Sequence, residues 1–186
     1  MNDELWPIVS SAVTAAIGGG IALLTAYATN RANAVRERER HDRDMAKHRE
    51  EMLRSRGEEL YILFDQWSTD LQAHAYLHGS WISGRISRNE ALEMVEKNIP
   101  PGRAIGRIEL LTAAYFPTVK RYLAKFLKAR DAANYIVGEQ ERRIRNSRVP
   151  EGSNSTFEDY QAACLDIDEA ADAVKFAIVA ELEKIQ

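Results

Sequence analysis

The stretch LYILFDQWSTDLQAHAYLHG, residues 60–79, decides the fold class of this chain. Its apolar and aromatic residues return every three or four positions, which is the period of an amphipathic helix. This stripe comprises Leu60, Phe64, Trp67, Leu71, His74 with Ala75, and His78. No segment of the chain alternates with period two over the length of a strand. The sequence therefore predicts an all-α protein.

Two further segments share this period, residues 105–144 and 157–185, and a short helix is expected over residues 88–98. A turn is expected over residues 79–84, and the pair Ser87 and Glu90 matches a capping box that opens the next helix. Pro117 interrupts the longest segment and either kinks it or starts a new helix. We therefore expect residues 60–186 to form an antiparallel helical bundle with about four helical segments.

Upstream of the bundle, residues 5–30 form a run of 26 residues without a formal charge. As a helix, its inner stretch over residues 6–28 would span about 30–35 Å, which is enough to cross the hydrocarbon core of a bilayer. Trp6 and Tyr27 stand near its two ends, where interfacial aromatic residues are expected. No Lys or Arg precedes the run, which favours a retained anchor over a cleaved signal peptide. We predict an N-terminal tail and transmembrane helix over residues 1–30, against the alternative of a small-residue helix buried in a protein core.

Nine Lys and Arg residues follow within residues 31–56. By the positive-inside rule, this predicts a single-pass protein of the bacterial inner membrane, with its N-terminus outside and its C-terminal domain in the cytoplasm. Residues 31–59 alternate acids and bases and are expected to continue the anchor as a charged helical stalk. Their apolar seam is too thin for a strong coiled coil, and the mixed charges favour a solvated helix over nucleic-acid binding.

Two ladders of small residues run along the predicted anchor. Ala12, Ala16 and Gly20 form one, and Gly19 ends the other. Small residues four apart let helix backbones approach closely in lipid, so these positions are candidates for helix–helix packing in the membrane.

The last two segments of the chain carry opposite charge. Residues 103–148 hold 11 cations and 4 anions, whereas residues 149–186 hold 2 cations and 9 anions. The favoured interpretation is that the two helices are neighbours that partly neutralise each other. The alternative is that a basic face with Arg121, Lys125 and Lys128 binds phosphate on a lipid or a nucleic acid.

Two histidines are weak candidates for metal ligands. His74 and His78 are four residues apart, so both imidazoles lie on one face of a helix, but no third ligand follows from the sequence. The single cysteine, Cys164, falls on the apolar seam of the last segment, where a thiol behaves as a small apolar group. We expect no catalytic residue, no cofactor and no enzymatic activity.

The order of these features resembles a loose group of uncharacterised bacterial single-pass membrane proteins. The residues that carry the likeness are Ile17–Ile21, Arg36–Arg40, Leu60-Tyr61-x-x-Phe64, and Arg107–Leu111 followed by Pro117–Val119. The resemblance implies a Gly-rich membrane helix, an Arg/Glu-rich helix and a small cytosolic bundle, and it implies no activity.

From the sequence we predict a membrane-anchored, non-catalytic scaffold, tether or sensor. Its expected partners are the lipid bilayer and either a protein partner or further copies of itself, and not nucleic acid. The alternative function is a small membrane effector, of the toxin, holin or phage-defence type, whose oligomerising anchor perturbs the bilayer.

Overall fold

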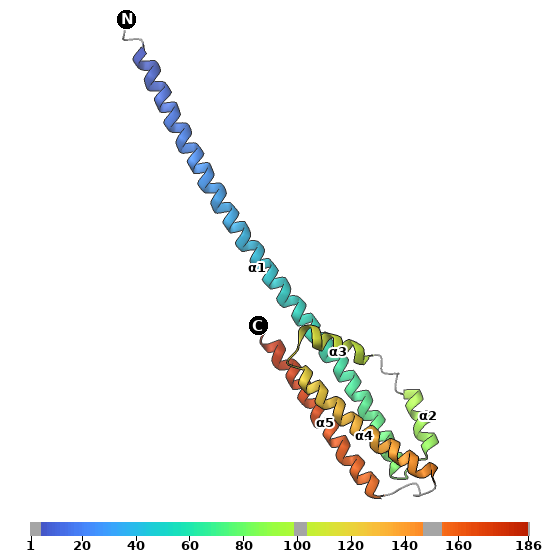
Figure 1. Ribbon diagram of the computed structural model, residues 1–186. Coiled ribbons are helices and arrows are strands. Elements are labelled where there is room, and N and C mark those ends of the chain that lie inside the picture. The colour runs from blue at the N-terminus through green and yellow to red at the C-terminus, as the bar shows by residue number, and fades with distance from the viewer. Residues whose placement is uncertain (1–4, 99–103, 147–153, 186) are drawn as a thin grey trace. The chain divides into compact units, whose positions relative to one another are not determined.

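The computed structural model describes residues 5–98, 104–146 and 154–185, and of residues 5–24 it describes the backbone alone. All the regular structure in these ranges is helical, and they contain no strand (Figure 1). The helices are α1 (Leu5–Ile82), α2 (Arg88–Asn98), α3 (Ala104–Tyr115), α4 (Lys120–Arg145) and α5 (Asn154–Glu183). The prediction of an all-α helical bundle is confirmed.

The chain divides into two compact units, residues 1–50 and residues 51–186. The described part of the first unit is entirely α1, and every side chain from residue 25 to residue 50 is exposed. Such a helix has no apolar face to bury, which agrees with the alternating acids and bases of its sequence.

The predicted membrane anchor is not supported. In the part of the chain that the structure describes, no helix combines the length and the apolar character needed to cross a membrane. This finding overturns the predicted transmembrane helix and the predicted single-pass location in the inner membrane. The sequence offers a physical reason, because seven of residues 6–28 are Gly, Ser or Thr and α1 continues without a break into a densely charged stretch.

The second unit is held together by an aromatic cluster between α1 and α4. The ring of Phe126 lies 5.1 Å from that of Phe64 and 5.2 Å from that of Trp67, and both pairs meet edge to face. Arg130, one turn further along α4, lies over the Trp67 ring at 5.9 Å. A later residue of α1 therefore contacts a later residue of α4, which shows that the two helices run in the same direction.

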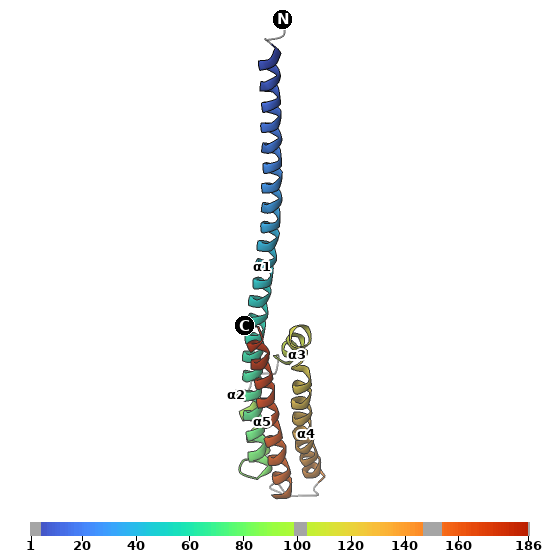
Figure 2. The ribbon, with the colours of Figure 1, turned by 90° about the vertical axis from the view of Figure 1, so that its left-hand side faces the viewer.

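Helix α5 runs in the opposite direction to both. Asp65 of α1 pairs with Lys175 at 2.6 Å, whereas Ala75, further along α1, accepts a hydrogen bond from Tyr160 at 3.1 Å. The expected antiparallel arrangement is thus right for α5 and wrong for α1 with α4. The chain can place α4 parallel to α1 because α2 and α3 intervene and return it to the starting end of the bundle (Figures 1 and 2).

The end of α1 is set by Gly84 rather than by Gly79. Gly84 has a φ of 74°, its N–H donates to the carbonyl of Trp81, and the N–H of Arg85 donates to the carbonyl of Ser80, both at 2.9 Å. These two bonds define a Schellman motif, which requires the left-handed conformation that glycine adopts most readily. The predicted turn over residues 79–84 therefore begins later than expected, because the helix continues to the buried Ile82.

Two local predictions about helix boundaries can be checked directly. The backbone N–H of Ser87 donates to the Glu90 carboxylate at 2.7 Å and the Ser87 hydroxyl accepts from the N–H of Glu90 at 3.3 Å, so the capping box is confirmed. Pro117 separates two helices instead of kinking one. A turn in which the N–H of Val119 donates to the carbonyl of Phe116 joins them.

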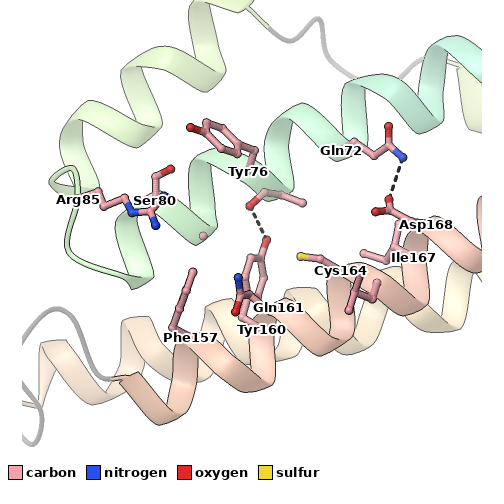
Figure 3. A pocket seen from close by; sticks show the side chains of 13 residues that line it. Gln72, Tyr76, Ser80, Arg85, Phe157, Tyr160, Gln161, Cys164, Ile167 and Asp168 are labelled. Atoms are coloured by element: carbon pink, nitrogen blue, oxygen red, sulfur yellow. Dashed lines mark hydrogen bonds between the residues drawn. The ribbon is translucent and has the colours of Figure 1, made fainter.

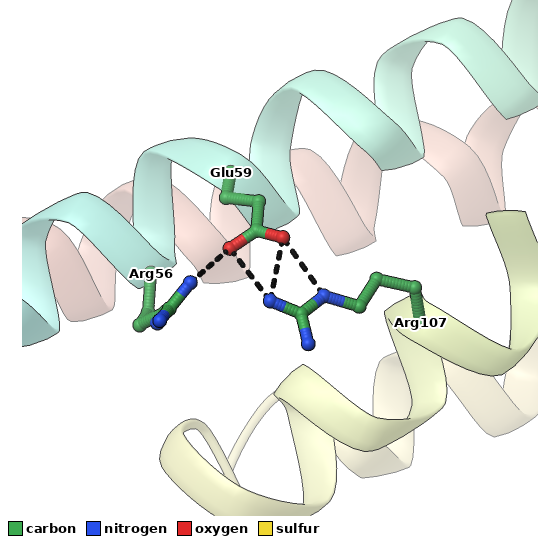
Figure 4. A network of polar contacts seen from close by, with 3 residues as sticks. All are labelled: Arg56, Glu59 and Arg107. Atoms are coloured by element: carbon green, nitrogen blue, oxygen red, sulfur yellow. Dashed lines mark hydrogen bonds and ion pairs between the residues drawn. The ribbon is translucent and has the colours of Figure 1, made fainter.

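A polar network attaches α3 to α1 (Figure 4). Glu59 accepts hydrogen bonds from Arg56 at 2.8 Å and from two nitrogens of Arg107 at 2.8 and 3.1 Å. The hydrogen bonds from Arg56 and then Arg107 lower the pKa of the Glu59 carboxyl. Close by, a Cβ at Gly57 would lie 3.1 Å from Phe116 and closer still to Leu182, so α1 is already packed into the bundle here.

The roles of the two glycines give a stability prediction. Gly84→Ala should lower the free energy of unfolding by about 1 kcal/mol, because alanine is strained at positive φ. Gly79→Ala is the matched control: it should raise that free energy by up to about 1 kcal/mol, since the new Cβ would lie 3.5 Å from Tyr160, an ordinary contact, inside a helix. Urea unfolding followed by tryptophan fluorescence measures both, and equal shifts for the two variants would contradict this account of the helix end.

Candidate functional site

The candidate site is a groove (Figure 3). It lies between the last turns of α1 and the first turns of α5. Its volume is about 630 Å³, and it is open to solvent. We call it the α1/α5 groove. The side chains that give it its character are Tyr76, Arg85, Phe157, Tyr160, Cys164 and Leu165.

Helical spacing places these side chains in two facing rows. On α1 the lining residues Gln72, Tyr76 and Gly79 recur at steps of four and three. On α5, Phe157 and Cys164 are seven residues apart and face α1 across the groove (Figure 3). Gly79 carries no side chain, which leaves space against Phe157 and Tyr160. The groove therefore forms where the two antiparallel helices pack against each other and α1 presents a glycine in place of a larger side chain.

Two apolar residues at the groove are largely exposed. Tyr76 and Leu165 are each 69% exposed, although large apolar side chains usually find partners in a core. They lie on opposite walls, one from α1 and one from α5. An apolar groove whose rims present a Tyr and a Leu can accept another apolar surface.

Two hydrogen bonds join α1 and α5 along the groove. The hydroxyl of Tyr160 donates to the carbonyl of Ala75 at 3.1 Å, and the amide of Gln72 donates to the Asp168 carboxylate at 2.8 Å (Figure 3). Burial, followed by the neighbouring Cys164, raises the pKa of the Tyr160 hydroxyl. These bonds join the helices and hold the shape of the groove.

Cys164 is a free, half-buried thiol on the floor of the same groove. Burial raises the pKa of this thiol, so the neutral form dominates at neutral pH. Because the thiolate is the nucleophile, the site does not activate Cys164 for covalent chemistry.

The two histidines named by the sequence come together at the edge of the core. The Nε2 atoms of His74 and His78 lie 3.2 Å apart, and the ring of His78 also meets Trp81 at 6.1 Å. One imidazole N–H donates to the bare nitrogen of the other. Among the described residues no group of three possible ligands gathers around a metal position, so the pair lacks the third ligand that a protein metal site needs.

The predicted basic face lies on the exposed side of α4. Arg121, Lys125 and Lys128 are all exposed, and the Arg121 guanidinium bonds the hydroxyl of Tyr122 at 2.9 Å and stacks over its ring at 4.7 Å. Neither lysine takes part in an ion pair with another described residue. The charges of these two lysines are therefore not neutralised by an ion pair with any described residue.

The residues predicted to anchor the chain in a membrane fall mostly outside the described side chains. This holds for Trp6, Ala12, Ala16, Gly19 and Gly20, while Tyr27 is 66% exposed on α1. The α1/α5 groove was not predicted from the sequence. The sequence does contain an indication of the groove, because Tyr76 and Leu165 are large apolar residues outside the apolar stripes of their helices.

No protein-family model, curated protein or solved structure matches this chain. The resemblance to bacterial single-pass membrane proteins therefore stays a prediction from the sequence.

The histidine pair generates a pH prediction. Burial, and then the charge of His74, lowers the pKa of His78 to about 4, and burial lowers the pKa of His74 as well. In the unfolded chain a histidine titrates near 6.5, so below that pH the unfolded state binds protons that the folded state refuses. The free energy of unfolding should then fall as the pH drops from about 6.5 toward 4, by at most about 1.4 kcal/mol per pH unit for one imidazole.

Urea midpoints measured across this pH range test the prediction. Acidic residues also protonate there, so His78→Gln serves as the comparison: it keeps a polar side chain and removes the titrating group. The variant should lose stability more gradually on acidification than the native chain. Parallel pH profiles for the two proteins would show that His78 is not responsible.

Proposed function

We propose that this protein is a non-catalytic scaffold that binds a helical segment of a partner protein in the α1/α5 groove. The observation that carries the proposal is the pair of exposed apolar side chains, Tyr76 and Leu165, on the two walls of an open apolar groove. Amphipathic helices bind in grooves of this kind by inserting apolar residues spaced three and four apart. A tether or a sensor would use the same contact.

The chemistry of the groove supports binding rather than catalysis. The Tyr160 hydroxyl and the Asp168 carboxylate are held in bonds between helices, and the Cys164 thiol stays neutral. A general base or a nucleophile would need a pKa tuned toward neutral pH and a free path to a substrate. The lining instead resembles a helix-packing surface on which no further helix is bound.

The charge of α5 suggests the chemistry of the partner. This helix forms one wall of the groove and carries eight acidic residues and a single lysine. A partner helix with Lys or Arg beside its apolar anchors would complement that wall, and it would associate faster at low salt. The alternative function, an effector that perturbs a bilayer, depends on a membrane anchor that the described helices do not support.

Site-specific photo-cross-linking in the native host cells tests the proposal. A photoreactive amino acid at position 76 or 165 should produce a discrete cross-linked product. The same group at position 110 is the control, because Leu110 is also an exposed apolar residue, at 56%, but lies on α3 away from the groove. Adding Leu165→Glu should abolish the product formed at position 76. Cross-linking that is equal at all three positions, or absent from both groove positions, would refute partner binding in the groove.

A further inference from the structure

Neighbouring helices α4 and α5 carry opposite charges that they do not neutralise by direct pairing. Helix α4 has eight Lys and Arg against three acids, and α5 has one Lys against eight acids. The two helices pack along each other (Figure 2). Yet no ion pair among the described residues joins them. The pairs of α4 are made within α4 or to α2, and those of α5 are made to α1 or to Lys184, which directly follows the helix. The excess charge of each helix therefore remains on its exposed side.

An exposed stripe on α4 combines two cations with an apolar end. It consists of Lys125, Lys128, Ala132 and Tyr135, at steps of three, four and three. All four residues are exposed, and the Tyr135 side chain is 74% exposed. We call it the cationic stripe.

Helix α5 carries a matching stripe with two anions and an apolar end. It consists of Glu169, Asp172, Phe176 and Val179, again at steps of three, four and three. All four are exposed, and Phe176, at 76%, is the most exposed large apolar residue among those that the structure describes. We call it the anionic stripe. None of the four charged residues of the two stripes forms an ion pair with another described residue.

The two stripes match position by position when their helices lie side by side in the same direction. The resulting pairs are Lys125 with Glu169, Lys128 with Asp172, Ala132 with Phe176, and Tyr135 with Val179. Cations then meet anions, and apolar residues meet apolar residues. Equal steps of three and four are what allow two helices to stay in contact over several turns.

This match cannot form within one chain. Helix α4 runs parallel to α1 and α5 runs antiparallel to it, so α4 and α5 of one molecule run in opposite directions. Both stripes also face solvent. We infer that the cationic stripe of one copy binds the anionic stripe of a second copy, with the two helices parallel.

The inferred contact joins two different surfaces of the same chain. Each copy therefore keeps one stripe free after the first contact, and association continues into a closed ring or an open filament. The stripes share no residue with the lining of the α1/α5 groove, so self-association and partner binding are independent properties.

Sedimentation velocity of the full chain tests the contact. At a salt concentration of about 50 mM the chain should sediment as species larger than its 21.0 kDa monomer, and at about 500 mM, where the charges are screened, it should dissociate. A chain that stays monomeric at low salt would refute the inference. If that monomer binds phosphatidylglycerol vesicles through Lys125 and Lys128, the cationic stripe serves a phosphate surface instead.

Charge reversal identifies the surfaces. Lys125→Glu with Lys128→Glu, or Glu169→Lys with Asp172→Lys, should each weaken self-association at least about tenfold, because two attractions become repulsions. The pair Lys120→Glu with Arg145→Glu is the control, since it makes the same change of charge on α4 outside the stripe. Circular dichroism verifies that each variant is folded.

Restoration of the contact separates this interface from any other. An equal mixture of the two reversed variants should associate again, and so should a single chain that carries all four substitutions, because each acidic stripe then meets a basic one. Association that survives either single reversal would place the contact elsewhere in the chain. Failure of both the mixture and the fourfold variant to associate, with folding intact, would also overturn the inference.

Discussion

The edge-to-face contact of Phe126 with Phe64 and Trp67 is the interaction on which the rest of the bundle depends. Phe64 and Phe126 are completely buried, and their rings join two helices that are far apart in the sequence. Large aromatic side chains bury much apolar area and also prefer defined ring angles, so they set both the distance and the register of a helix pair. Once α1 and α4 are parallel, α5 has to run antiparallel to both, because the short connection from α4 makes it start at the end of the bundle where α4 stops.

The direction of α5 explains both surface features of the protein. Its antiparallel packing on α1 brings Gly79 opposite Phe157 and Tyr160, which opens the α1/α5 groove. Its antiparallel packing beside α4 also prevents the two charged stripes, which both face solvent, from matching position by position within one molecule. The binding properties that we propose for the protein are thus consequences of helix direction and not of any single reactive residue.

The N-terminal part of α1 shows how an uncharged run can mislead. The prediction of an anchor gave weight to the absence of charge, to the length of the run and to the cations that follow it. Freedom from charge is only part of what a bilayer requires, because each Gly, Ser or Thr in a spanning segment contributes little favourable transfer energy. The same helix continues into residues 31–50, where alternating acids and bases leave all described side chains exposed.

Local features of this fold were determined by the sequence alone. The helical period of residues 60–79, the capping box at Ser87 and the meeting of His74 with His78 depend on residues a few positions apart, and local geometry is enough to predict them. Only the tertiary structure decided that α1 and α4 are parallel, that Tyr76 and Leu165 face a common groove, and that the charges of α4 and α5 point outward. These features depend on which face of each helix is covered by a distant part of the chain, and the period of an isolated helix does not contain that information.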